Sequence, residues 1–173
     1  MLSEQLIQKI ESLAEDIATR EGCRLYDIEF AGSGQGRILR VYIDKLGGAG
    51  IEDCSNVSRG LNLILDVEDV IPGGAYSLEV STPGLDRVLR KPWHFTEAVG
   101  KKIWMKTSKS LGDLGMQSKK LQSAKQLSEL VASTTETGVN FLIENENVFV
   151  PFDVIEKAKM VFEFKEKGKK KTH

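Results

Sequence analysis

Two stretches with helical periodicity alternate with three stretches of strand periodicity in the first half of this chain, and this order restricts the fold more than any other feature. One helix is predicted between Ser3, which suits an N-cap, and Gly22, which can adopt the left-handed conformation that ends a helix. Its apolar residues recur at spacings of four, three and four: Leu6, Ile10, Leu13 and Ile17. A second helix is predicted from spacings of three, four and three in Cys54, Val57, Leu61 and Ile64.

The segments around these helices alternate apolar and polar residues, which is typical of half-buried strands. They cover residues 26–30, 39–43 and 76–80, and a glycine-rich hairpin at 32–36 joins the first two. The resulting order, α-β-β-α-β, predicts a small sheet with two helices that can cover one of its faces, a KH-like arrangement. We therefore expect an α+β protein whose first domain spans residues 1–90.

The glycines of this half raise the possibility of a phosphate-binding loop. The 32–36 segment joins two strands, whereas a dinucleotide-binding loop leads into a helix whose N-terminal amides meet the phosphate. The 47–50 segment does precede a helix, but no Lys-Ser/Thr pair follows it, and Glu52 and Asp53 would repel an anion. We therefore expect loop glycines, no cofactor and no small-molecule substrate.

Beyond residue 91 the pattern changes to short apolar runs separated by turns, which predicts a small β-barrel over residues 91–164. The expected strands lie around Ile103 and Met105 and in the runs 130–132, 139–143, 148–150 and 160–164. Residues 107–128 are polar and are expected to form a long mobile loop. The end of the chain, 165–173, is expected to be a lysine-rich solvated tail.

The two halves of the chain carry opposite charge. The whole sequence is nearly neutral, with 24 basic and 25 acidic residues. Residues 1–90 contain nine basic and 15 acidic side chains, a net charge of −6. Residues 91–173 contain 15 basic side chains, all of them lysine, and ten acidic ones, a net charge of +5. Such an asymmetry indicates two modules with different partners.

Lysines of the second half are the candidate RNA-binding residues. A lysine surface without arginine suits attraction to the phosphate backbone better than the reading of bases. The candidates at the start of the barrel are Lys101, Lys102, Lys106 and Lys109. The alternative is a lysine face that only keeps the protein soluble. Trp104, which lies among them, is expected to pack in the core rather than to stack on a base.

Composition excludes several functional classes. No apolar run approaches the roughly 18 residues of a membrane span, and the N-terminus lacks the basic and apolar blocks of a secretion signal. Two cysteines and two histidines supply neither a disulfide framework nor a histidine-rich metal site. A nucleophilic pair of Cys54 and His94 would lack an orienting third group. We expect a reduced cytoplasmic protein with no catalytic residue, no metal and no membrane partner.

One string in the chain carries a family resemblance. Residues 79–87 read EVSTPGLDR, and they follow RVYID at 40–44 and the pair Ser58 and Arg59. In this order the motifs resemble the bacterial ribosome maturation factor RimP family, and the segments GKK at 100–102 and PFDVIEKA at 151–158 continue the likeness. The resemblance implies that the second domain is a small barrel of the Sm-like or SH3-like type.

The same resemblance implies a function. It predicts a non-enzymatic factor that binds the immature small (30S) ribosomal subunit and aids its maturation. The implied partners are a basic ribosomal protein near the decoding centre and ribosomal RNA. The alternative is a free RNA-binding regulator that acts on messenger RNA. The net charge of −6 in the first domain disfavours this alternative, because an acidic surface repels phosphate.

The candidate partner-binding residues surround the proline-glycine turn of this string. The turn would project Asp86 and Arg87 from the end of a strand, where Arg87 can hydrogen-bond a phosphate or a carboxylate. The alternative is a structural role, in which an Asp-Arg pair holds the domain junction. If the acidic half binds RNA instead, a patch of Arg37, Arg40, Arg59 and Arg87 would have to explain it. The full candidate set is Ser81, Thr82, Pro83, Gly84, Asp86, Arg87 and Arg59.

Overall fold

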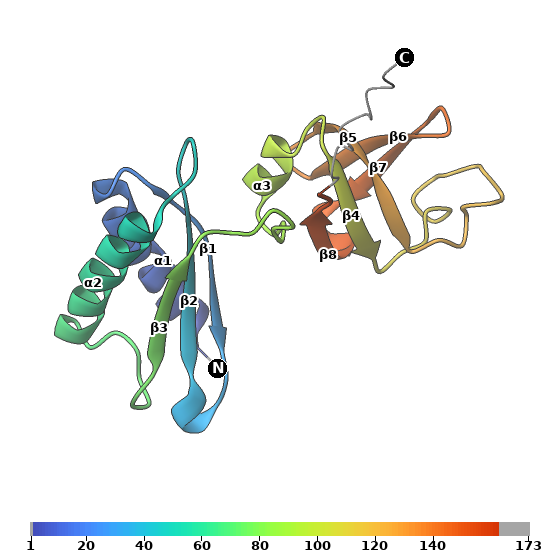
Figure 1. Ribbon diagram of the computed structural model, residues 1–173. Helices are drawn as coiled ribbons and strands as arrows, with labels where there is room; N and C mark the ends of the chain where they lie inside the picture. Colours follow the sequence, from blue (N-terminus) through green and yellow to red (C-terminus); the bar gives the residue numbers. More distant parts are fainter. Residues whose placement is uncertain (1, 163–173) are drawn as a thin grey trace, which may run out of the picture. The chain divides into compact units, whose positions relative to one another are not determined.

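The chain folds into two compact units in the computed structural model, which describes residues 2–162 (Figure 1). The first unit ends at Pro83 and the second begins at Gly84. Each unit contains helical segments and its own β-sheet, so the expected α+β class is confirmed. The lysine-rich tail at 165–173 lies outside the described residues. No helix within residues 2–162 combines the length and the apolar character that crossing a membrane requires.

The boundary between the units lies at Pro83 and Gly84, whereas the sequence places it at residues 90 and 91. The segment after Gly84 belongs to the second unit because its backbone pairs there. The N–H of Leu89 donates to the Ala158 carbonyl at 2.9 Å, and the N–H of Met160 donates to the Arg87 carbonyl at 3.0 Å. The proline-glycine turn itself therefore marks the boundary.

The first unit has the order of elements that the periodicities predict. It contains α1 (Glu4–Arg20), β1 (Arg24–Ala31), β2 (Ile38–Asp44), α2 (Ile51–Val67) and β3 (Ser77–Ser81). β2 is the central strand, antiparallel to β1 and parallel to β3. At the start of α1 the Ser3 hydroxyl accepts a hydrogen bond from the N–H of Leu6 at 3.3 Å, and beyond its end Gly22 has a φ of 71°.

Both helices pack against one face of this sheet (Figure 1). Gly60 in the middle of α2 permits their close approach, because a Cβ atom at this position would lie 3.1 Å from Cγ2 of Ile17 on α1. The side chains that β2 turns toward the helices are fully buried: Leu39, Val41 and Ile43. The helices contribute Ile10, Ala14, Ala18, Val57, Leu61 and Leu65 to the same core.

The second unit contains the short helix α3 (Pro92–Glu97) and five strands. These are β4 (Lys102–Thr107), β5 (Gln126–Thr134), β6 (Gly138–Ile143), β7 (Glu146–Pro151) and β8 (Ile155–Met160). The strands form one sheet in the order β7-β6-β5-β4-β8, with all neighbours antiparallel. β7 and β8 are its outer strands and do not pair with each other, so the described sheet is not the closed barrel that the sequence predicts. A 3-10 turn, Phe152–Val154, separates them and directs β8 to β4.

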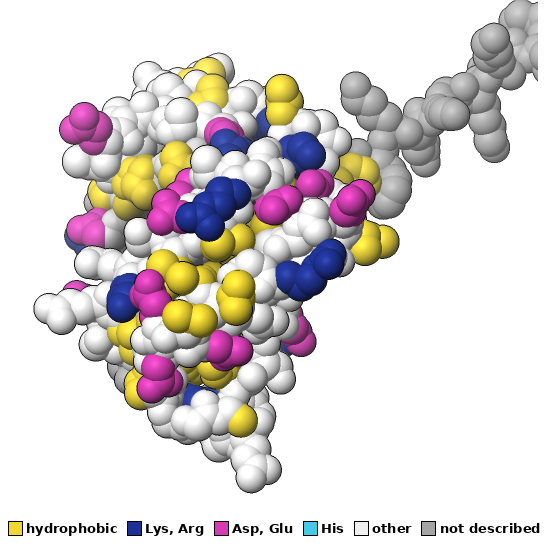
Figure 2. All heavy atoms as spheres, turned by 90° about the vertical axis from the view of Figure 1, so that its left-hand side faces the viewer, with side chains coloured by type: hydrophobic (Ala, Val, Ile, Leu, Met, Phe, Trp, Pro, Cys, Tyr) yellow, Lys and Arg dark blue, Asp and Glu magenta, His cyan; other side chains and the backbone are white. Residues whose placement is uncertain are grey.

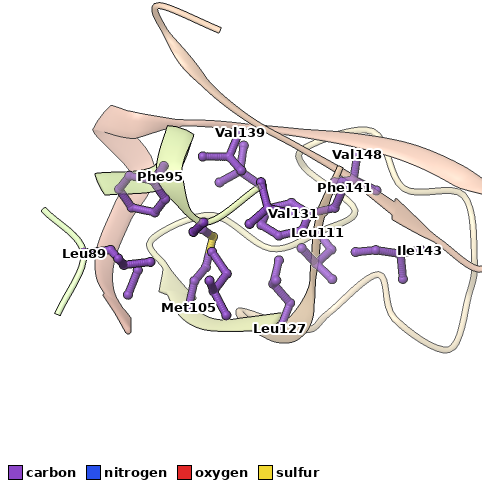
Figure 3. Close-up of a cluster of buried hydrophobic side chains, with 14 of the residues drawn as sticks. Leu89, Phe95, Met105, Leu111, Leu127, Val131, Val139, Phe141, Ile143 and Val148 are labelled. Carbon is purple, nitrogen blue, oxygen red and sulfur yellow. The ribbon is translucent and has the colours of Figure 1, made fainter. Parts of the chain in front are cut away.

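The segment between β4 and β5 is packed into the core of the second unit and is not the mobile loop that its polar sequence predicts. Leu111 and Met116 are only 1% and 2% exposed. Figure 3 shows Leu111 among the core side chains, close to Val131 and Phe141. The N–H of Leu111 also donates to the Ala124 carbonyl at 2.8 Å. Leu111 and Met116 thus anchor this segment in the core, and the partly buried Leu114, Leu121 and Ala124 pack against the same cluster.

Two further elements differ from the sequence prediction. The predicted strand at 160–164 is displaced, since β8 ends at Met160 and the residues after 162 lie outside the described part of the chain. The helix α3 is not predicted at all, although Pro92 at its first position is a residue that favours a helix start. A helix of six residues is too short to show a period.

Candidate partner-binding and RNA-binding sites

The structure divides the predicted partner-binding string between the two units. Ser81 ends β3, and Thr82 and Pro83 complete the first unit. Gly84 begins the second unit, which also holds Asp86 and Arg87. Arg87 folds back on its own turn, where its Nε donates to the Gly84 carbonyl at 3.4 Å. Residues 79–83 of the string thus belong to the first unit, and residues 84–87 belong to the second.

A shallow groove of about 780 Å³ lies between α2 and the end of β3 in the first unit. It brings together three of the predicted residues, Arg59, Ser81 and Thr82. Hydroxyl groups, one guanidinium and the exposed Ile51 side chain allow this groove to contact both polar and apolar groups of a polypeptide. The other lining residues are Ala49, Gly50, Cys54, Ser55, Ser58 and Val80.

A carboxylate closes the start of α2 beside this groove. Oδ2 of Asp53 accepts a hydrogen bond from the N–H of Gly50 at 2.9 Å, and Oδ1 lies 3.3 Å from Nζ of Lys45. The Gly50 N–H lowers the pKa of the Asp53 carboxyl below its ordinary value, and Lys45 acts in the same direction. Because Asp53 occupies the place that an anion would take, the glycines at 47–50 do not form a phosphate site.

Arg59 lies exposed in the middle of α2 and is held along its own helix. Its Nη2 donates to Oδ1 of Asn56 at 3.0 Å, and its Nε donates to the Ser55 carbonyl at 3.4 Å. Both acceptors are uncharged, so they orient the guanidinium without neutralising it. Arg59 can therefore present its charge to a carboxylate or a phosphate of a partner.

The two residues considered for nucleophilic catalysis belong to different units, Cys54 to the first and His94 to the second. Burial, followed by the charge of Asp53, raises the pKa of the Cys54 thiol, which makes the reactive thiolate scarce at neutral pH. Nδ1 of His94 accepts hydrogen bonds from the N–H groups of Arg90 at 3.0 Å and Lys91 at 3.1 Å, and it thereby holds the start of α3. Within residues 2–162, no three His, Cys, Asp or Glu side chains are grouped so as to hold a metal ion.

Two arginines of the first unit, Arg40 on β2 and Arg37 just before it, contact acceptors of that unit. Nε of Arg40 lies 3.1 Å from the Glu79 carboxylate on the neighbouring strand. Arg37 donates to the carbonyls of Pro72 at 2.7 Å and Gly74 at 2.6 Å. The ion pair with Glu79 weakens the contribution of Arg40 to the alternative RNA-binding patch, whereas the carbonyl contacts orient Arg37 without neutralising its charge.

Two of the four predicted lysines lie on the outer face of β4. Lys102 and Lys106 occupy the positions of β4 that alternate with buried residues. Lys101 precedes this strand and Lys109 follows it. Nζ of Lys106 lies 3.6 Å from the Glu156 carboxylate, and the two side chains are 50% and 47% exposed. An ion pair this exposed is weak and is screened by salt.

Strand pairing adds two lysines to this face that sequence reasoning missed. β8 places Lys157 opposite Lys106 and Lys159 opposite Trp104. In β8 these lysines flank the fully buried Ala158, and this alternation is the sequence signal that could have identified them.

Trp104 is partly exposed on the same outer face, so the prediction that it packs in the core is wrong. The reason is the alternation of β4, which turns its neighbours Ile103 and Met105 into the core instead. The ammonium group of Lys159 lies 5.6 Å from the centre of the Trp104 ring, within the range of a cation–π contact.

The acidic side chains on the α2 side of the first unit are mixed with basic and apolar ones (Figure 2). Residues 1–83 contain seven basic and 14 acidic side chains, a net charge of −7. Figure 2 shows acidic and basic side chains interspersed around exposed hydrophobic ones on the side of α2. The exposed apolar residues of α2 include Leu63 and Val67, which are 67% and 73% exposed. The negative charge on this side is therefore not gathered into one cluster.

Residues 13–86 match a protein-family model described as the RimP N-terminal domain. The match runs from within α1 to Asp86 and includes all the residues that line the groove. It therefore covers the unit whose order of elements the periodicities predict, and it supports the family that the sequence motifs indicate.

Proposed function

We propose that the chain, whose residues 13–86 match the model of the RimP N-terminal domain, is a ribosome maturation factor of the RimP family and a non-enzymatic assembly factor of the small (30S) ribosomal subunit. It binds the immature subunit with two modules. The first unit contacts a basic ribosomal protein near the decoding centre, and the second contacts ribosomal RNA. The family match at residues 13–86 carries this proposal, since it contains the groove and most of the EVSTPGLDR string.

The charge of the first unit supports a contact with a basic protein. A net charge of −7 over residues 1–83 attracts a partner rich in lysine and arginine, speeds their encounter and repels RNA phosphates. Within the groove, Arg59 binds a carboxylate of that partner, and the hydroxyl groups of Ser81 and Thr82 bind its polar groups. In the second unit the contacts come from Gly84, Asp86 and Arg87, and Pro83 sets the turn before them.

The lysines of the second unit support a contact with ribosomal RNA. Residues 84–162 contain 12 basic and nine acidic side chains, a net charge of +3. Lys101, Lys102, Lys106 and Lys109 lie in or beside β4 and release counterions when they contact phosphates. The affinity of this unit for RNA therefore falls steeply as the salt concentration rises.

The alternative function is that of a free regulator of messenger RNA. Both functions place the protein in the cytoplasm, but they predict different companions. Sedimentation of a cell extract through a sucrose gradient separates them. We expect the protein to migrate with free small subunits, and cells that lack it to accumulate precursor RNA of the small subunit. Migration with messenger fractions would contradict the assembly function.

The proposed contact at Arg87 has its own test. We expect Arg87→Glu to weaken binding to purified small subunits about tenfold, because it reverses a charge at the interface, and to leave the melting temperature nearly unchanged. Lys119→Glu is the matched control, since it makes the same charge reversal at an exposed position of the segment after β4. A large fall in melting temperature for Arg87→Glu would assign the residue to the structural role.

A further inference from the structure

We propose that the outer face of strands β8, β4 and β5 is a binding platform for single-stranded RNA, on which Trp104 stacks against a base and lysines of β4 and β8 contact the phosphates. This inference rests on the proposed function, because it takes RNA of the small subunit as the ligand. The inference specifies in addition that the RNA is single-stranded and that its bases stack on Trp104.

The strand register places an aromatic ring near the centre of this face. β4 lies between β5 and β8 in the sheet (Figure 1). Trp104 on β4 is paired with Ser128 on β5 and with Lys159 on β8. Its neighbours along the strand, Ile103 and Met105, are fully buried on the opposite face. The Trp104 ring is therefore not needed to fill the core, and the short side chain of Ser128 leaves room beside it.

Four lysines surround this ring. Lys102 and Lys106 lie two positions from Trp104 in either direction along β4, and β8 contributes Lys157 and Lys159. Alternate residues of a strand are about 7 Å apart, so the ammonium groups follow the strands at regular intervals. The outward positions of β5 that pair with β4 are uncharged: Gln126, Ser128 and Leu130.

The contacts that Lys106 and Lys159 make within the protein are weak enough to exchange for phosphate. Lys106 pairs with Glu156 at 3.6 Å, but both side chains are about half exposed. Lys159 is exposed and rests 5.6 Å from the centre of the Trp104 ring. When a base covers the ring, the flexible Lys159 side chain can turn to the adjacent phosphate.

The chemistry of the face selects the class of ligand. Aromatic side chains on an exposed sheet stack on unpaired bases with little dependence on sequence. The bases of an RNA duplex are stacked on one another and cannot reach such a ring. Lysines contact phosphates as point charges, again without reading sequence. A ring surrounded by lysines therefore fits a single strand of RNA and not a duplex.

The experiment measures fluorescence anisotropy of the full chain with a labelled oligoadenylate and with a blunt-ended RNA duplex of equal length. We expect Trp104→Ala to bind the oligoadenylate about tenfold more weakly, since base–aromatic stacking is lost, and to bind the duplex as the unmodified chain does. Trp104→Phe, which keeps an aromatic ring, should retain most of the affinity. If Trp104→Ala lowers the melting temperature strongly, its RNA affinity no longer tests the proposal. The affinity of Trp104→Phe relative to the unmodified chain is then the test, and a large loss in that variant would contradict stacking on an aromatic ring.

A matched pair of lysine variants tests the phosphate contacts. The double change Lys157→Ala and Lys159→Ala should reduce the slope of log affinity against log salt by about 1.4, because each phosphate contact on a single strand contributes about 0.7. The control, Lys119→Ala with Lys120→Ala, removes the same charge from exposed positions outside this face. The control should leave the slope unchanged.

Two results would overturn the platform: equal effects of the two lysine pairs, or oligoadenylate binding that does not depend on Trp104. The face would then be a solvated surface. The sucrose gradient keeps this failure apart from failure of the proposed function. Trp104-dependent binding without migration on free small subunits would refute the assembly function and leave the platform intact. If the protein migrates with small subunits but its affinity for oligoadenylate does not depend on Trp104, the platform is refuted and the assembly function is supported.

Discussion

The first unit binds many of its charged side chains into its own structure, whereas the second presents a face of them to solvent. Arg40 on β2 lies 3.1 Å from Glu79 and 3.8 Å from Glu29, which belong to the two neighbouring strands. In the second unit, Lys157 and Lys159 project from β8 as exposed side chains. The two units therefore differ in how their charges are paired as well as in net charge, which is −7 for residues 1–83 and +3 for residues 84–162. Arg40 thus has carboxylate partners on both neighbouring strands, whereas the exposed lysines of β8 remain available to a polyanion.

The two units also differ in how their segments are anchored. The helices of the first unit bury a continuous apolar stripe, so many side chains contribute to holding each helix against the sheet. In the long segment between β4 and β5 only Leu111 and Met116 are fully buried, and Leu114, Leu121 and Ala124 are partly buried against the same core. The second unit should therefore be more sensitive to the loss of a single side chain outside its regular elements.

The largest effect is expected from Leu111→Ala. Removing this fully buried side chain should lower the free energy of unfolding by about 2–5 kcal/mol, through lost apolar burial and the cavity that remains. Hydrogen exchange resolved by residue should show the loss of protection in the second unit and not around Leu61 of the first. The control is Leu114→Ala, at a partly buried position of the same segment, where the loss should be smaller. Equal destabilisation of both units would contradict their independent cores.

Sequence periodicity predicts the first unit because its elements are amphipathic over several turns or residues. The buried positions Leu39, Val41 and Ile43 of β2 follow the expected alternation. The helix spacings identify Ile10, Val57 and Leu61 of the buried core but miss Ala14, Ala18 and Leu65. The second unit depends on pairs that are distant in the chain, such as Leu89 with Ala158. No local period reveals such a pair, so the sequence alone indicates neither the pairing of the 84–90 segment with β8 nor the order of the strands in the second sheet.

The candidate sites follow the same rule. Arg59, Ser81 and Thr82 were predicted as single residues, but the groove that unites them requires β3 to lie beside α2. Lys102 and Lys106 were predicted from a local run of lysines, whereas the lysines of β8 join them only through antiparallel pairing. The sequence contains the signal for the exposure of Trp104, because Trp104 lies between Ile103 and Met105, which alternate with it and face the core.

An intermediate effect is expected from Arg37, whose two carbonyl contacts represent the engaged charges of the first unit. Arg37→Ala should lower the free energy of unfolding by about 2 kcal/mol, because charged hydrogen bonds to Pro72 and Gly74 are lost. Arg37→Lys should be nearly as damaging, since an ammonium group cannot reproduce the fork that reaches both carbonyls. Urea unfolding measures both variants, and RNA affinity should stay unchanged in each. Full stability of Arg37→Lys would show that charge, and not geometry, matters here.

The smallest effect is expected at Asp53, and its pH dependence identifies the cause. Asp53→Ala should lower the melting temperature less than either preceding variant, because it removes the carboxylate that accepts from Gly50 at the start of α2. The pKa of this carboxyl is lowered in the folded state, so its contribution is present above the ordinary value of 3.8 and is lost as the pH falls through the folded-state pKa. The melting-temperature difference from the unmodified protein should therefore be constant from about pH 7 to about pH 5 and shrink below about pH 4. Glu52→Ala is the control, since Glu52 lies in the same first turn and shares the attraction to the helix dipole. If the two variants give equal losses with the same pH profile, the dipole accounts for the effect and the hydrogen bond to Gly50 does not.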